Sequence, residues 1–132
     1  MTKDTGDSDL HYIAVAYKTT LLCDYSKNEG NFRDFLGKIM KYLKYGRYIL
    51  TYKENNIFYI KDKEDKGLTF ILITGEDNIS INAFVALERT KEDFLKYFTR
   101  EEFAIKKING LQKDFEGKLE RHFVFFFEIR NK

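Results

Sequence analysis

Cysteine and histidine are the residues that could form a catalytic pair or bind zinc in this chain, and both are scarce. The chain contains one Cys, Cys23, and two His, of which His122 falls in a helical pattern. A Cys nucleophile and a His base also need an orienting group and an oxyanion site, and neither is recognisable around Cys23 and His122. One Cys and two His cannot complete a zinc site without carboxylates. We expect no enzyme, no metal and no cofactor, with Cys23 packed in a strand and His122 on a helix face.

Three other motifs suggest ligands, and each lacks a requirement. The run from Lys66 to Ile73 partly matches the RNA-recognition strand motif, but the aromatic residues that stack on bases are missing. Asn78-Ile79-Ser80 fits the glycosylation pattern, which we interpret as accidental because no signal region precedes it. The loop 62–66 interleaves Asp and Glu with Lys, which opposes cation binding. We expect no nucleic-acid partner, and a small RNA-binding or enzymatic α/β domain is the alternative from another class.

Composition points to one cytosolic domain. The chain has 132 residues, 33% charged and 43% hydrophobic, which is the globular range. Its net charge of +2 implies no strong polyanion partner. No run approaches the ~20 apolar residues that a membrane-spanning helix needs, and a single Cys forms no internal disulfide. We predict a flexible acidic tail over 1–9 and one domain over 10–132.

Hydrophobic periodicity predicts the elements that must position any site. Apolar runs over 12–17 and 20–25 indicate a hairpin, and those over 48–52, 57–61 and 68–74 indicate a three-strand meander. Apolar residues at helical spacing predict a helix of about three turns from Phe32 to Leu43 that stops at Tyr45-Gly46. Two further helices are predicted, over 80–98 and from Leu111 to Ile129.

The predicted order ββαβββαα implies an α/β fold. The first and last strands of the set are apolar on both faces, as in strands covered on two sides. The first helix is therefore expected on one face of a five-stranded, antiparallel-rich sheet and the last two helices on the other.

Five segments together resemble a known family. They are the run from Ala16 to Leu22, Gly30-Asn31-Phe32, Leu50-Thr51-Tyr52, Ala83-Phe84-x-x-Leu87-Glu88-x-x-Lys91-x-x-Phe94, and Phe115-x-x-x-Leu119-Glu120-Arg121-His122-Phe123. Each segment is common alone, but at these separations they resemble the longin domain of synaptobrevin-like (VAMP-type) R-SNAREs, from Leu10 to Lys132. The resemblance implies a profilin-like fold and a non-catalytic role in vesicle trafficking and membrane fusion, on the cytosolic face of vesicles or endomembranes.

The resemblance also implies a binding site. Longin domains bind the SNARE motif of the same protein, sorting adaptors or other SNAREs through a hydrophobic groove between the first helix and the third strand. By position, the groove would be lined by Phe32, Ile39, Met40, Leu43, Leu50 and Tyr52. The bland alternative is core packing, which we expect for Phe32, Ile39 and Leu43. Met40 and Tyr52 are expected to be exposed in the groove, since Met40 lies at the edge of the apolar stripe.

The sequence departs from the family pattern in several places. The heptad-rich SNARE motif and the membrane anchor do not follow Lys132, and we expect an excised domain rather than a protein that has lost fusion activity. Tyr45-Gly46 stands where the family commonly has Pro. A possible second apolar patch of Val124, Phe125 and Phe127 either packs against the missing SNARE segment or reflects compositional drift. A longin-like small subunit of a coat or tethering complex is the alternative within the binding class.

Overall fold

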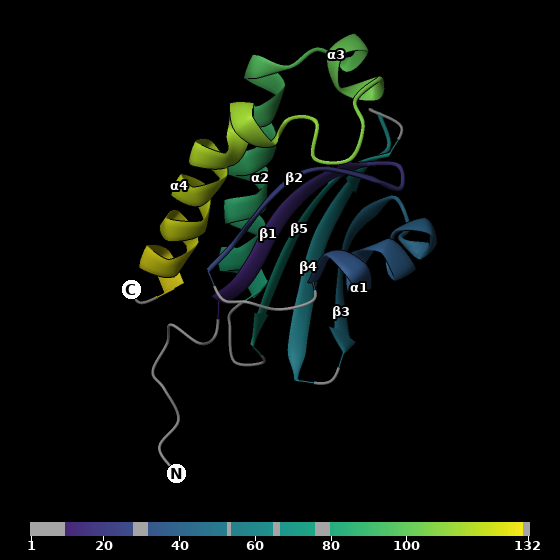
Figure 1. Cartoon of the computed structure of the whole chain (residues 1–132). Helices are drawn as coiled ribbons and strands as arrows, with labels where there is room; N and C mark the ends of the chain where they lie inside the picture. The colour runs from purple at the N-terminus through teal and green to yellow at the C-terminus, as the bar shows by residue number, and fades with distance from the viewer. Residues whose placement is uncertain (1–9, 28–31, 53, 65–66, 76–79, 131–132) are drawn as a thin grey trace.

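The computed structural model describes residues 10–27, 32–52, 54–64, 67–75 and 80–130 (Figure 1), so the predicted tail over 1–9 lies outside it. The strands are β1 (Leu10–Tyr17), β2 (Thr20–Ser26), β3 (Gly46–Tyr52), β4 (Asn55–Asp62) and β5 (Leu68–Gly75). The helices are α1 (Phe32–Ile39), the 3-10 helix η2 (Met40–Tyr42), α2 (Ser80–Tyr97), α3 (Arg100–Ala104) and α4 (Gln112–Arg130). The predicted α/β class and the order of the main elements are confirmed.

The strands form one antiparallel sheet in the order β2-β1-β5-β4-β3. Strand β5 is central, and every one of its residues from Leu68 to Thr74 is buried. A strand that has neighbours on both sides and layers on both faces needs an apolar residue at every position, which is the pattern seen in the sequence. The prediction that β1 and β5 are interior strands is confirmed.

Each face of the sheet has its own core (Figure 1). In β1, Ile13 and Val15 contribute to the core under α2 and α4, whereas Tyr12, Ala14 and Ala16 contribute to the core under α1. Side chains alternate between the faces of a strand, so one apolar run supplies both cores. The expected arrangement, with one helix on one face and the long helices on the other, is confirmed.

The first helix differs from the prediction near its end. An α-helix was expected through Leu43, but α1 ends at Ile39 and the chain continues as the 3-10 helix η2. A 3-10 turn has about three residues per turn instead of 3.6, so the side chains that follow do not lie on a straight α-helical projection. Gly46 then begins β3 with φ +124, where a Cβ would approach the Tyr48 ring to 3.1 Å. Glycine is therefore required where β3 begins, but the helical segment has already ended at Tyr42, before the stop predicted at Tyr45-Gly46.

Helix α3 lies between the two long helices, in a stretch for which the sequence predicts no helix. Thr99 precedes it as the N-cap, its hydroxyl accepts a bond from the Glu102 N–H, and the Glu102 carboxylate accepts one from the Thr99 N–H. This capping box follows the Thr-x-x-Glu pattern and was a readable signal. Phe103 is the one buried apolar residue of this short helix. A single apolar residue gives no helical periodicity, so the pattern of hydrophobic residues could not reveal α3.

Candidate functional site

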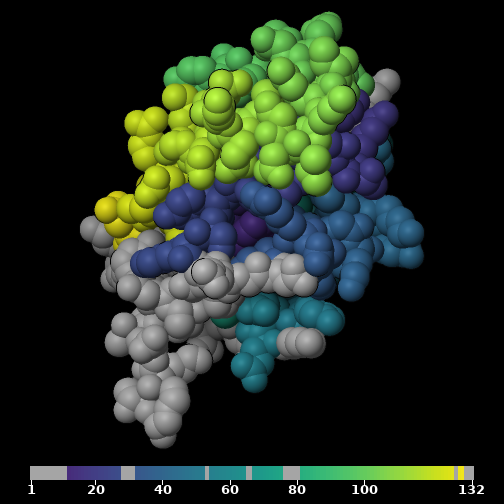
Figure 2. All heavy atoms as spheres, viewed as in Figure 1, coloured from purple at the N-terminus to yellow at the C-terminus, as the bar shows by residue number. Residues whose placement is uncertain are grey.

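The two edges of the sheet differ in what covers them. Strand β2 is covered, because the backbone N–H groups of Asn109 and Leu111 donate to the carbonyls of Leu21 and Leu22 at 2.7 and 3.0 Å. Figure 2 shows the segment that leads into α4 lying against β2. Strand β3 forms the other edge, all seven of its residues are exposed, and within the described residues its only strand neighbour is β4. An exposed strand edge offers unpaired backbone groups to another chain.

Beside this open edge, the start of α1 and the end of β3 enclose a hollow of about 300 Å³. It is lined by Phe32, Asp34, Phe35, Lys38, Tyr52, Asn55, Ile57 and Ile73. Two of the lining rings, those of Phe35 and Tyr52, stack on each other with centroids 4.8 Å apart and an interplanar angle of 25°. We call this hollow, together with the adjoining surface of β3, the α1–β3 groove. Its floor is apolar, and Asp34 and Lys38 place opposite charges on its rim.

Three of the residues predicted for the groove border it. Phe32 is half-buried and Tyr52 is 48% exposed, and both line the hollow. Leu50 is 37% exposed and pairs with Ile57 in the antiparallel register. Its side chain lies on the same face as that of Tyr52, two residues further along β3, because side chains alternate between the faces of a strand. Ile39 is half-buried and packs against the core under α1.

Two of the predicted residues are buried. Leu43 is 7% exposed, in agreement with the core packing expected for it. The expectation that Met40 is exposed in the groove is wrong, because Met40 is 4% exposed and belongs to the core under α1. Met40 lies four residues after the buried Leu36 and three before the buried Leu43, so the face toward the core is centred on these residues and not on Phe32 and Ile39, which are half-buried.

Sequence reasoning missed three residues that line the hollow, Phe35, Ile57 and Ile73. Phe35 falls within the helix predicted from Phe32 to Leu43 but is not among the residues predicted for the groove, although it stacks on Tyr52. Its position three residues after Phe32, on the same helix face, was the available signal. Ile57 and Ile73 belong to strands β4 and β5, so only the sheet register places them beneath α1.

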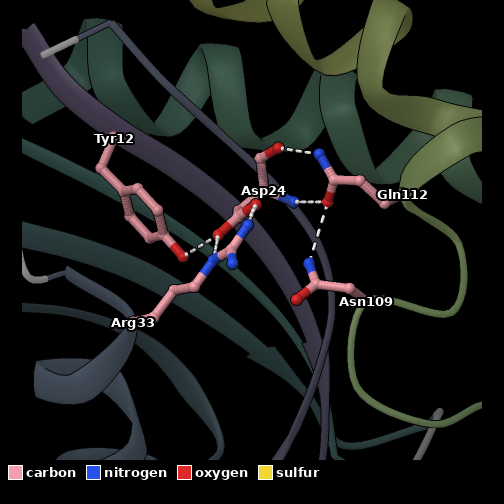
Figure 3. A network of polar contacts seen from close by, with 5 residues as sticks. All are labelled: Tyr12, Asp24, Arg33, Asn109 and Gln112. Atoms are coloured by element: carbon pink, nitrogen blue, oxygen red, sulfur yellow. Dashed lines mark hydrogen bonds and ion pairs between the residues drawn. The ribbon is translucent and has the colours of Figure 1, made fainter. Parts of the chain in front are cut away.

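A polar network holds the start of α1 against the sheet (Figure 3). The Asp24 carboxylate accepts bonds from the Tyr12 hydroxyl at 2.8 Å, from Arg33 Nε at 2.7 Å and from Arg33 Nη2 at 3.0 Å. The Tyr12 ring in turn stacks on Phe32 with centroids 5.1 Å apart. Burial, and then the Asp24 charge, raises the pKa of the Tyr12 phenol, so this hydroxyl stays a donor. The network therefore positions Phe32 at the groove.

The same network reaches α4. The Gln112 side chain accepts from the Asp24 N–H at 2.8 Å and donates to the Asp24 carbonyl at 2.6 Å, as a neighbouring strand would. Asn109 Nδ2 also donates to Gln112 Oε1 at 3.0 Å. The amide of Gln112 thus caps the edge of β2, and Asp24 links α4 to α1 through its backbone and its side chain.

A second hollow, of about 450 Å³, lies on the opposite face of β3, and sequence reasoning did not anticipate it. It is lined by Arg47, Ile81, Phe84, Val85, Glu88, Arg89 and Glu92. Arg47 crosses this hollow, because it forms an ion pair with Glu88 and its guanidinium lies 5.1 Å from the centroid of the Phe84 ring. These contacts already occupy the polar groups of Arg47 and Glu88.

Of the second apolar patch, the structure describes the side chains of Val124 and Phe125. Val124 is 43% exposed, whereas Phe125 is half-buried under the Arg89 guanidinium, 3.9 Å from the ring centroid. The side chain of Phe127 lies outside those described. Phe125 is thus paired with a cation of α2, and both interpretations of the patch remain predictions.

Cys23 and His122 have the structural surroundings expected of them. Cys23 is fully buried, and His122 Nε2 lies 2.8 Å from the Asp93 carboxylate on α2. Within the described ranges, no three His, Cys, Asp or Glu side chains come together as metal ligands could. Among the same residues, no helix combines the length and the apolar character needed to cross a bilayer.

The thiol of Cys23 should be unreactive while the protein is folded. Burial raises the pKa of this thiol, and the thiolate is the form that reacts. We expect iodoacetamide to label Cys23 at least about a hundredfold more slowly in native buffer than in denaturant, because labelling must await opening of the core. Mass spectrometry of timed aliquots measures both rates, and similar rates would contradict the burial of Cys23.

Comparisons with known proteins identify the family of the chain. The sequence model of the longin family, described as a regulated-SNARE-like domain, matches residues 22–119. Putative vesicle-associated membrane protein 726 of Arabidopsis thaliana is 30% identical over 122 residues, which cover 91% of this chain and 54% of that protein. Vesicle-associated membrane protein 723 of the same plant is 26% identical over 120 residues, 91% of this chain and 55% of that protein.

The chain spans about half the length of these relatives. The family match covers most of the chain, and it includes all of α1, β3 and the hollow between them. The chain therefore belongs to the longin family, and it is a longin domain of the R-SNARE type found in vesicle-associated membrane proteins.

Proposed function

We propose that the α1–β3 groove binds a peptide segment and so makes this domain a regulatory module of an R-SNARE. The observation that carries the proposal is the apolar-floored hollow at the stacked Phe35–Tyr52 pair, beside the open edge of β3. The occupant is the SNARE motif of the same protein, a segment of a sorting adaptor, or another SNARE protein. Membership of the longin family supports this role.

The groove offers two kinds of contact to such a segment. The outer edge of β3 presents backbone N–H and C=O groups that an extended chain can pair with, which gives affinity with little sequence preference. Leu50, Tyr52 and the hollow offer apolar contacts at regular spacing, which select the side chains of the ligand. A segment with apolar anchors on one face, extended or helical, matches this surface.

Regulation follows from competition for one surface. While the groove holds the SNARE segment of the same protein, that segment is withheld from SNARE assembly and an adaptor is excluded. Release of the segment frees the groove for the adaptor. An adaptor that binds only the free groove therefore raises the fraction of molecules in which the SNARE segment is released. The full-length protein then acts in vesicle trafficking and fusion from the cytosolic face of a vesicle or endomembrane. Longin and VAMP proteins form a non-enzymatic trafficking family, which supports a binding role.

The test is a titration with a defined SNARE segment. The 132-residue chain is titrated with a synthetic heptad-repeat SNARE segment, and the affinity is measured by calorimetry. We expect Leu50→Ser combined with Tyr52→Ser to weaken binding by about tenfold or more, since one buried aromatic anchor is worth about 2 kcal/mol at an interface.

A matched control is available on α2. Leu95 is 37% exposed and Tyr97 is 55% exposed, close to the values for Leu50 and Tyr52. Leu95→Ser with Tyr97→Ser therefore removes similar apolar area away from the groove, and its affinity should stay within about twofold of wild type. Equal affinity in the groove variant and in wild type, with both folded by circular dichroism, would refute the assignment.

A further inference from the structure

The turn from α1 into β3 presents an unusual set of side chains to solvent. From Lys38 to Tyr48, all exposed residues are Lys, Arg, Tyr or Gly, while Met40 and Leu43 face the core. The stretch 35–53 contains no Asp or Glu. We call Lys38, Lys41, Tyr42, Lys44, Tyr45 and Tyr48 the basic tyrosine patch. Apart from Lys38, which also borders the hollow, the patch lies at the opposite end of α1 and β3 from the hollow, and Figure 1 shows this turn on the side of the molecule away from α4.

The three rings of the patch are exposed although they are large. Tyr42 is 72% exposed, Tyr45 is 49% exposed and Tyr48 is 43% exposed. Lone exposed rings are ordinary, but three on one turn form a surface that favours a partner. A Tyr ring has an apolar body and a polar tip, which suits the boundary between an apolar phase and water.

The backbone beneath the rings is held in place. Lys61 Nζ donates to the Leu43 carbonyl at 3.0 Å and lies 5.0 Å from the centroid of the Tyr45 ring. The Lys44 N–H donates to the Tyr59 hydroxyl at 3.1 Å. With Met40 and Leu43 buried below, the turn is anchored to β4 and to the core. The patch is therefore a preformed surface, which lowers the ordering cost of binding.

The lysines of the patch are not held in salt bridges. Lys38, Lys41 and Lys44 are exposed, and none of them forms a salt bridge with an acidic side chain in the part of the chain that the structure describes. Arg47, the next cation along the chain, is paired with Glu88 on the other face of the sheet. The small net charge of the whole chain thus conceals a local cluster of three cations.

We infer that the basic tyrosine patch docks on the surface of an anionic phospholipid bilayer. Lysines near such a surface are attracted to acidic headgroups, and Tyr rings settle at the depth of the headgroups. The free cations are all Lys, which acts as a hydrated point charge, whereas paired recognition of one carboxylate or phosphate favours Arg. Tyr42 and Tyr45 line neither the α1–β3 groove nor the hollow on the other face of β3, so the patch suits a broad surface better than an acidic peptide.

Vesicle binding tests this inference. The 132-residue chain is floated with phosphatidylcholine vesicles and with vesicles that also contain about 30% phosphatidylserine. We expect binding to the phosphatidylserine vesicles alone, weakened several-fold when the salt is raised from about 0.05 to about 0.5 M, because salt screens exposed charges. Equal binding to both vesicle types, or to neither, would overturn the inference.

Two variants and a matched control locate the surface. Lys41→Glu with Lys44→Glu should lower the partition coefficient at least tenfold, and Tyr42→Ser with Tyr45→Ser several-fold. Lys106 and Lys107, exposed after α3, make the control, since Lys106→Glu with Lys107→Glu changes the net charge equally at another site. An equal loss in this control would show a non-specific charge effect and overturn the assignment.

Two further outcomes separate this inference from the groove and from a protein ligand. Leu50→Ser with Tyr52→Ser should leave vesicle binding unchanged, since neither residue belongs to the patch, and a comparable loss would refute a separate surface. Poly-glutamate is tested with the same lysine and tyrosine variants. If these variants weaken poly-glutamate binding and the wild-type chain does not bind vesicles, the partner is an acidic polypeptide and the membrane assignment is wrong.

Discussion

Replacing Phe94 by Ala should lower the free energy of unfolding by about 3–5 kcal/mol. Phe94 is fully buried, and its ring packs with centroids 4.8 to 5.8 Å from those of four other rings. These rings are Phe70 of β5, Phe98, Phe103 of α3 and Phe115 of α4. Truncation leaves a cavity between elements that cannot close around it independently, so the lost contacts are not recovered.

Urea unfolding monitored by circular dichroism measures this loss. Phe94→Leu keeps most of the apolar volume and should cost less than half as much, while the exposed Tyr97→Ala on the same helix should change stability by less than about 1 kcal/mol. The slope with urea should be unchanged, which assigns the effect to the folded core. A cost for Phe94→Ala as small as that of Tyr97→Ala would contradict its central place.

Replacing Asp24 by Ala should cost about 2–4 kcal/mol and should also weaken binding at the groove. The carboxylate is buried, and its loss leaves the hydroxyl of the buried Tyr12 without the acceptor that the structure shows. Arg33 is 59% exposed, so its guanidinium can return to water, and the cost should be below that of breaking a fully buried pair. Phe32 stacks on Tyr12 and precedes Arg33, so the start of α1 should loosen where it lines the hollow.

Two variants separate the parts of the network. Asp24→Asn retains an oxygen acceptor for Tyr12 but loses the charge, so it should cost less than Asp24→Ala. Gln112→Ala removes the cap on the edge of β2 while leaving the carboxylate contacts, and its cost of about 1 kcal/mol should come with unchanged groove affinity. Groove affinity is measured with the same SNARE segment at temperatures where each variant is folded. If Asp24→Ala and Gln112→Ala affect affinity equally, the network does not position the groove.

Much of the architecture could be predicted because the spacing of apolar residues along the chain shows which faces of a strand or helix are buried. Strands β1 and β5 are apolar on both faces, and that pattern alone placed them in the interior of the sheet. The stripe of α1 likewise predicted a helix with one buried face. The groove was harder, because its position came from resemblance and its residues from a straight helical projection. That projection failed at Met40, which packs in the core under α1, and it left out Phe35.

By itself, the sequence determined the order of the main elements, the interior strands and the family, since each depends on patterns repeated over several residues. Only the tertiary structure decided which sheet edge stays open, because β2 is capped by Asn109, Leu111 and Gln112, about 90 residues further along the chain. The tertiary structure also decided that the buried Asp24 carboxylate joins Tyr12 and Arg33. Contacts of this kind between separate elements produce no periodic pattern in the sequence from which they could be predicted. A site made where separate elements meet depends on register and helix geometry, and these are set only when the elements pack together.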